Sequence, residues 1–160
     1  MKSDRSVLLA EDDSNDVLLL QLAFQEAGIR NPLHVVHDGQ EAIDYLSGTE
    51  KFSDRSRFPF PALLILDLKM PRKTGIDVLE WLAKEDAMRC LPTIMLSSSV
   101  HPGDIEKAYR LGVNAFVVKS PSTAQRTEFA RMIKTFWLTL AELPLICTDG
   151  LEAAREGYSP

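Results

Sequence analysis

The strongest constraint on the fold is a set of five short, mainly apolar runs separated by longer amphipathic segments. The runs are rich in Val, Ile and Leu and lack polar alternation, a pattern typical of strands covered on both faces, as in a parallel sheet. They are residues 6–10, 33–37, 62–66, 92–96 and 115–119. Right-handed crossovers through the intervening segments would place helices on both faces of the sheet. The sequence therefore predicts an α/β fold of the (βα)5 type with a five-stranded parallel sheet.

Helix boundaries are marked by residues that favour helix ends. Asp38 with Glu41, and Ser122 with Gln125, match the spacing of a capping box, which predicts helix starts at both places. Gly28 follows an amphipathic segment and is expected to end its helix. The polar, proline-bearing stretch 48–61 exceeds what a minimal unit of this fold needs, and we expect a long loop there.

Length and charge limit the class of protein to which this chain can belong. The chain has 160 residues, which fits one domain, and we expect that domain at 1–143 with a partly disordered or partner-contacting tail at 144–160. The net charge of −5 argues against a nucleic-acid surface. No apolar run approaches the roughly 18 residues of a membrane span, so we expect a cytoplasmic protein. The two cysteines, Cys90 and Cys147, are expected to be reduced.

Polar residues follow several of the predicted strands. Ligands bind beyond the carboxyl ends of the strands in open parallel α/β sheets. Carboxylates crowded at that edge need a compensating cation, and a few oxygen ligands suit Mg²⁺ together with phosphate. The residues concerned are Glu11, Asp12 and Asp13 after the first run, Asp67 after the third, Ser97 after the fourth and Lys119 in the fifth. The pattern predicts an acidic, Mg²⁺-binding, phosphate-handling site, with Asp13 more suited to capping a helix than to ligation.

Four ordered motifs carry a family resemblance: LLAEDD, LLILDLKMPRKTG, IMLSSS and FVVKS. With them, the chain resembles a response-regulator receiver domain of two-component signalling from about Val7 to Leu140. The resemblance implies the CheY-like, or flavodoxin-like, fold: a three-layer sandwich whose parallel strands follow the order 2-1-3-4-5. It also implies a phosphoacceptor switch that reacts with a sensor histidine kinase. Slow self-catalysed phosphorylation and dephosphorylation would then be its only enzymatic activity.

The resemblance implies roles for individual residues. The implied Mg²⁺ ligands are Glu11, Asp12, Asp67 and the backbone carbonyl of Lys69. The implied catalytic residues are Asp67 as phosphoacceptor, Ser97 and Lys119. Ser97 and Phe116 would form the conformational switch, and the side chains of Lys69 and Ser99 would tune the lifetime of the phosphorylated state. Phe116, in a strand, also fits plain packing.

Further features are similar to phytochrome-associated single-domain response regulators. These features are the long loop before the third strand, Ser120 after Lys119, and the segment FWLTLAELP near the end of the match. They imply a bacteriophytochrome-type kinase as phosphodonor. We also expect a homodimer through the face formed by the fourth helix, fifth strand and fifth helix. Phe136 and Trp137 fit either the core or a partner surface.

Other functions remain alternatives. An aspartyl nucleophile with Mg²⁺ and lysine also fits a phosphatase-like hydrolase, but such enzymes carry a second Asp two positions after the nucleophile, where this chain has Lys69. A phosphorelay intermediate that passes its phosphoryl group to a histidine phosphotransfer protein is a further alternative. A DNA-binding regulator is disfavoured, because no helix-turn-helix pattern follows the fifth helix.

Overall fold

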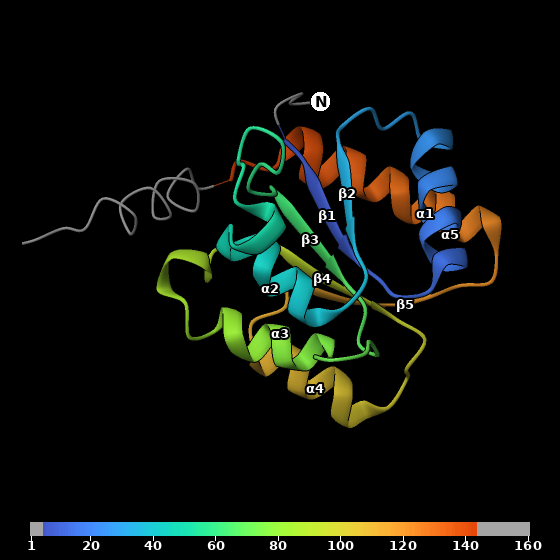
Figure 1. Cartoon of the computed structure of the whole chain (residues 1–160). Coiled ribbons are helices and arrows are strands. Elements are labelled where there is room, and N and C mark those ends of the chain that lie inside the picture. The colour runs from blue at the N-terminus through green and yellow to red at the C-terminus, as the bar shows by residue number, and fades with distance from the viewer. Residues whose placement is uncertain (1–4, 144–160) are drawn as a thin grey trace, which may run out of the picture.

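The structure, a computed structural model, describes residues 5–143 and contains the predicted parallel sheet (Figure 1). Neighbouring strands are all parallel, in the order β2-β1-β3-β4-β5. The strands are β1 (Val7–Ala10), β2 (Leu33–Val36), β3 (Leu63–Leu66), β4 (Thr93–Ser97) and β5 (Ala115–Val118). The predicted fold class and strand order are confirmed, and the observed strand ends lie within one residue of the predicted runs.

Helices cover both faces of the sheet, which gives three layers (Figure 1). On one face lie α1 and α5, and on the other lie α2, α3 and α4. Their bounds are α1 (Ser14–Glu26), α2 (Gly39–Ser47), α3 (Gly75–Leu82), α4 (Pro102–Arg110) and α5 (Thr123–Met132). Two short 3-10 turns, Glu50–Phe52 and Asp86–Met88, precede β3 and β4, and α5 continues as a π-helical segment, η3 (Ile133–Leu140).

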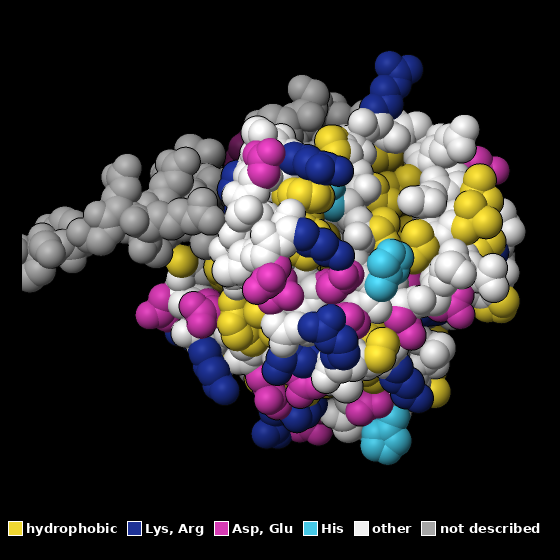
Figure 2. Space-filling view, in the orientation of Figure 1, with side chains coloured by type: hydrophobic (Ala, Val, Ile, Leu, Met, Phe, Trp, Pro, Cys, Tyr) yellow, Lys and Arg dark blue, Asp and Glu magenta, His cyan; other side chains and the backbone are white. Residues whose placement is uncertain are grey.

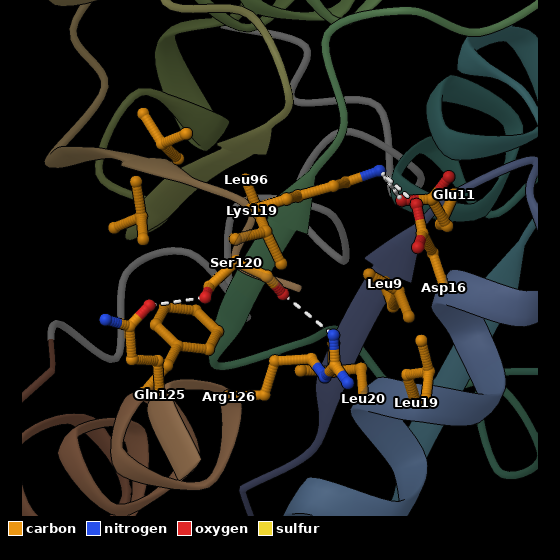
Figure 3. Close-up of a pocket in the computed structure, with 13 residues that line it drawn as sticks. Leu9, Glu11, Asp16, Leu19, Leu20, Leu96, Lys119, Ser120, Gln125 and Arg126 are labelled. Atoms are coloured by element: carbon orange, nitrogen blue, oxygen red, sulfur yellow. Dashed lines mark hydrogen bonds and ion pairs between the residues drawn. The ribbon is translucent and has the colours of Figure 1, made fainter. Parts of the chain in front are cut away.

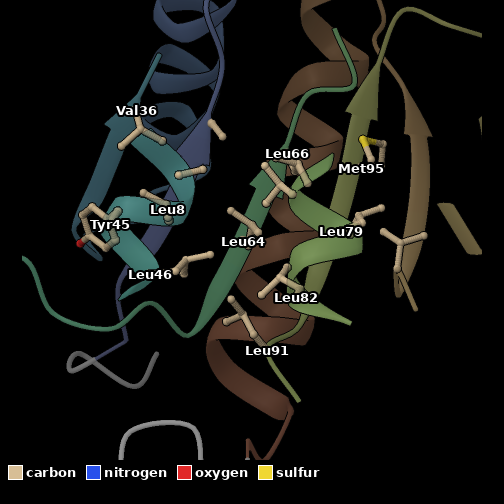
Figure 4. Packing of buried hydrophobic residues seen from close by; sticks show 14 of the residues in the cluster. Leu8, Val36, Tyr45, Leu46, Leu64, Leu66, Leu79, Leu82, Leu91 and Met95 are labelled. Atoms are coloured by element: carbon tan, nitrogen blue, oxygen red, sulfur yellow. The ribbon is translucent and has the colours of Figure 1, made fainter. Parts of the chain in front are cut away.

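The central strand shows why both faces need helices. Each residue of β3 is fully buried, and successive side chains point to opposite faces. Leu64 and Leu66 pack in the cluster beneath α2 and α3 (Figure 4), whereas Leu63 and Ile65 pack beneath α1 and α5. Burying a side chain of this size stabilises the fold by about 1.5–3 kcal/mol. The apolar run thus places β3 in the middle of the sheet. The carboxyl end of β3 lies at the edge of the sheet where the other parallel strands also end.

The predicted helix ends are observed, but neither predicted capping box is complete. The Asp38 carboxylate accepts a hydrogen bond from the Glu41 N–H at 2.8 Å and caps α2. The Glu41 carboxylate, however, accepts from the His37 N–H at 3.0 Å, one residue before the cap, so the capping box is only half formed. Ser122 caps α5 through the Gln125 N–H, but the Gln125 side chain accepts from the Ser120 hydroxyl, so this box is also half formed. Gly28 follows α1 with φ +68°, the left-handed conformation that favours glycine.

The long stretch before β3 packs on the end of α2. Phe52 and Phe58 contact the ring of Tyr45, with ring centroids 5.1 and 6.0 Å from it. Arg55 donates hydrogen bonds to the carbonyl oxygens of Tyr45 and Leu46 at 2.7 and 2.6 Å. These bonds satisfy carbonyl groups that the end of a helix leaves without partners. The stretch therefore extends the core at the end of the sheet opposite Asp67.

Two expectations concern the cysteines and the C-terminal tail. Cys90 is disulfide-bonded, so the expectation of a reduced thiol is wrong for this residue. Cys147 and the proposed tail 144–160 lie outside the described residues. Within 5–143, no helix combines the length and the apolar character needed to cross a membrane.

Candidate functional site

Asp67 follows β3 and is the only carboxylate that this strand delivers to the sheet edge. Its backbone N–H donates to the Ala10 carbonyl at 3.0 Å, which ties the ends of β3 and β1 together. The residue is 6% exposed, and its Oδ1 accepts a hydrogen bond from the Leu68 N–H at 2.8 Å. Burial raises the pKa of Asp67 above its usual value, although the Lys119 charge and the Leu68 N–H oppose the shift.

The turn after Asp67 depends on a glycine. The Gly75 N–H donates to the Leu68 carbonyl at 2.9 Å, at the start of α3. A Cβ atom at Gly75 would lie 2.2 Å from the carbonyl oxygen of Asp67, closer than any side chain can approach. The close contact between the backbones of Gly75 and Asp67 therefore sets the path of the chain directly after β3.

The acids after β1 meet Asp67. Glu11 is buried and Asp12 is exposed. Glu11, Asp12 and Asp67 each offer one carboxylate oxygen, and these three oxygens lie within 4.8 Å of one another. Burial raises the pKa of Glu11, and the negative charge of Asp67 adds to the shift against the hydrogen bond from Lys119. Converging carboxylates repel one another and gain from a cation, and oxygen ligands suit a hard divalent ion. The residues present therefore fit a divalent metal.

Lys119 follows β5 and reaches across the sheet edge to the acids (Figure 3). Its Nζ lies 2.6 Å from Glu11 Oε2, 2.7 Å from Asp16 Oδ2 and 3.4 Å from Asp67 Oδ2. Burial alone would lower the pKa of Lys119, but the hydrogen bonds to Asp16 and Glu11 and the charge of Asp67 raise it above the ordinary value. The ammonium is therefore a fixed positive charge at physiological pH.

Asp16 was not predicted to belong to the site. It lies in the first turn of α1, where an acidic residue is expected for helix stability alone. No pattern in the sequence separates it from such a helix-end acid. Asp13 caps α1 by accepting hydrogen bonds from the Asn15 and Asp16 N–H groups, as the sequence predicted.

The remaining predicted residues surround this cluster. Ser97 ends β4 next to β3, is fully buried, and accepts a hydrogen bond from the Ser99 N–H at 3.2 Å. The Ser99 hydroxyl donates to Asp104 Oδ2 at 2.8 Å. Phe116 is half-buried on the side of the sheet covered by α2, α3 and α4. The Lys69 side chain is exposed.

The loop after β5 and the histidines complete the surroundings of the site. All peptide bonds among residues 5–143 are trans, which includes the bond between Lys119 and Ser120. The histidines are outside the acid cluster. The His34 ring packs against Tyr45 and Phe58, and His101 caps α4.

Three converging carboxylates and an ammonium at the carboxyl edge of a CheY-like sheet are the arrangement of a receiver domain, the class that takes a phosphoryl group from a histidine kinase. The model of the response regulator receiver domain family matches residues 7–131. The chain belongs to this family and is a response regulator of two-component signalling. Receiver domains bind a divalent metal, and the acid cluster is placed for one.

Proteins of known structure are similar over most of their length. The response regulator RPA3017 in red light signalling of R. palustris is 39% identical, with a TM-score of 0.82 over 88% of this chain and 98% of that one. The phosphorylated cyanobacterial phytochrome response regulator RcpA is 31% identical, with a TM-score of 0.80 over the same shares. The response regulator Rcp1 of Synechocystis sp. is 29% identical over 86% of this chain and 92% of its own, and its structure has been solved with Mn²⁺ bound.

Proposed function

We propose that Asp67 is the residue that accepts the phosphoryl group, in a site where Glu11, Asp12 and Asp67 hold Mg²⁺. The observation that carries this proposal is the convergence of the three carboxylates within 4.8 Å, with the Lys119 ammonium 3.4 Å from Asp67. The backbone carbonyl of Lys69, two residues after Asp67, would supply a further oxygen. Bound Mg²⁺ neutralises negative charge on phosphoryl oxygens.

The transfer is an in-line displacement at phosphorus. A carboxylate oxygen of Asp67 forms a bond to phosphorus as the P–N bond of the kinase phosphohistidine breaks, and the imidazole leaves with the electron pair. Lys119 pairs with an oxygen of the transferred group. Water then attacks the acyl phosphate, which releases inorganic phosphate and restores the Asp67 carboxylate. Slow self-catalysis of these two steps is the only enzymatic activity proposed.

The switch runs from Ser97 to the surface near β5. In the phosphorylated protein, the Ser97 hydroxyl turns to a phosphoryl oxygen and draws the loop after β4 inward. Phe116, half-buried in β5 opposite Met95 of β4, rotates into the space that the loop leaves. Support comes from the position of Ser97 at the end of β4, next to β3. A local charge then biases two arrangements of one element, the form a phosphorylation switch takes.

The proposed partners are a phytochrome-type histidine kinase and a second copy of the chain. Support for the kinase comes from the similarity to RPA3017 and RcpA, which are described in red light and phytochrome signalling. Exposed Tyr109 on α4 and Val118 on β5 support a homodimer through the α4-β5-α5 face. A monomeric mass by light scattering, with and without phosphorylation, would contradict the dimer.

We also propose a protein partner in the cytoplasm, and no nucleic acid or membrane. On the face over α2 and α3, Figure 2 shows Lys and Arg side chains mixed with Asp and Glu. A nucleic-acid surface would instead gather basic residues on one face.

Incubation with acetyl phosphate and Mg²⁺ tests the function against its alternatives. The proposal predicts one phosphoryl group per chain and slow release of phosphate. Rapid multiple turnover with varied phosphomonoesters would instead indicate a phosphatase. Quantitative passage of the phosphoryl group to a histidine phosphotransfer protein would indicate a relay.

A further inference from the structure

Asp16 binds the lysine that the phosphoryl group also needs. Its Oδ2 lies 2.7 Å from Lys119 Nζ, whereas the Asp67 oxygen lies 3.4 Å from the same nitrogen. Figure 3 shows the Lys119 side chain extended from β5 toward Glu11, which follows β1, and Asp16, which lies in the first turn of α1. The ammonium is therefore held on the α1 side of the site.

The surroundings make the ion pair between Asp16 and Lys119 stronger than a pair on the open surface. The Lys119 side chain is 18% exposed and that of Asp16 is 39% exposed. A cavity of about 240 Å³ lies below them between α1, β5 and α5, lined mainly by apolar side chains such as Leu9, Leu20 and Phe129. Apolar walls limit screening by water, and the cavity leaves room for the lysine stem to change rotamer.

Glu11 and Asp16, the two carboxylates that hold Lys119, differ in their other contacts. Glu11 belongs to the cluster of three acids that fits a divalent metal, whereas Asp16 lies outside that cluster. The Glu11 carboxylate also accepts a hydrogen bond from the Asp13 N–H at 3.1 Å, which fixes it near the metal position. Asp16 is therefore the partner whose main contact at this site is the ammonium.

We propose that Asp16 is a positioning residue that holds the Lys119 ammonium toward α1 in the unphosphorylated protein and competes with the phosphoryl group for it. This inference rests on the proposed function of Asp67. Contact between Lys119 and a phosphoryl oxygen on Asp67 requires the ammonium to leave Asp16 or to share its protons. Asp16 thus stabilises the unphosphorylated state and slows phosphorylation.

The test compares Asp16→Asn with wild type. Asparagine keeps the size of the side chain but removes the charge, so Lys119 is released toward Asp67. Phosphorylation by acetyl phosphate, followed by intact mass, should become about two- to five-fold faster, the effect of losing a partly exposed ion pair. In the metal-free protein, the NMR signal of the Lys119 ammonium should lose protection from exchange with water.

Two variants and a stability measurement isolate the effect. Asp13→Asn removes the same charge from the same segment, retains a good helix cap and should leave the rate unchanged. Asp16→Glu keeps the charge and should restore slow phosphorylation. Thermal unfolding of each variant verifies that it is folded.

The outcomes separate this inference from the proposed function. If wild-type protein gains no phosphoryl group, the proposed function fails. If wild type is phosphorylated but Asp16→Asn is no faster than Asp13→Asn, or is slower than wild type, only the role of Asp16 fails. An unchanged Lys119 ammonium signal in folded Asp16→Asn protein would also overturn it.

Discussion

Lys119 lies closer to Glu11 than to Asp67: its Nζ is 2.6 Å from Glu11 Oε2 and 3.4 Å from Asp67 Oδ2. Lys119 therefore neutralises Glu11, the more buried of the two acids, more strongly than it neutralises Asp67. One carboxylate oxygen of Asp67 makes no bond to Lys119. A carboxylate that is to act as a nucleophile needs such an oxygen. The arrangement keeps the cluster stable before a cation or phosphoryl group arrives.

Lys119→Ala should destabilise the protein as well as slow phosphorylation. The substitution leaves the buried Glu11 carboxylate without its cation, and breaking such a pair costs about 1–3 kcal/mol or more of unfolding free energy. Urea unfolding at neutral pH measures the loss. Lys107→Ala is the matched control, because Lys107 pairs with Glu80 at 2.9 Å on the surface and should cost less than about 1 kcal/mol. Equal losses in the two variants would contradict the assigned role of Lys119.

Asp67→Asn should stabilise the metal-free protein at neutral pH. Burial raises the pKa of Asp67 in the folded state, so the ionised carboxylate is disfavoured there. A carboxyl group of this kind contributes stability while it is protonated, below its unfolded pKa of about 3.9, and loses that contribution as pH rises through the folded pKa. The gain from Asp67→Asn should therefore be present at pH 7 and fade toward pH 4. Denaturant unfolding in EDTA across this range measures it, and a gain independent of pH would argue against a raised pKa.

Metal binding should depend on Asp12 and on pH. Glu11 and Asp67 have raised pKa values in the metal-free protein, so Mg²⁺ must displace protons in the acid range and its affinity should rise with pH there. Removing one of three carboxylates through Asp12→Asn should weaken Mg²⁺ binding about tenfold or more. Calorimetry measures both effects, with Asp13→Asn as the control for charge. Equal affinity in the two variants would place the ion elsewhere.

Gly75→Ala should disturb the site through the backbone. Its Cβ would lie 2.2 Å from the Asp67 carbonyl oxygen, so the turn must move, at a cost of about 1–3 kcal/mol. Both the urea midpoint and the phosphorylation rate should fall. In Gly103→Ala the new Cβ meets only the His101 ring, at 3.1 Å, and that flexible side chain can shift. A Gly75→Ala variant as stable as Gly103→Ala would show that the turn is not constrained as described.

The sheet and most of the acid cluster were predictable because both follow from the alternation of strands and helices. An apolar run such as 62–66 specifies a buried strand, and parallel strands carry Glu11 and Asp67 to one edge. Asp16 was not predictable as a site residue, because acids in a first helical turn are common for reasons of helix stability. The π-helical geometry of Ile133–Leu140 was also missed, since its apolar spacing fits an α-helix.

The central claim, that Asp67 receives the phosphoryl group, is tested most directly by intact mass after incubation with acetyl phosphate and Mg²⁺. Wild type and Asp13→Asn should each gain one phosphoryl group, and the gain should require Mg²⁺. Asp67→Asn, compared under the same conditions, should gain none. A phosphoryl adduct that persists in folded Asp67→Asn protein, or the absence of an adduct in wild type, would contradict the account.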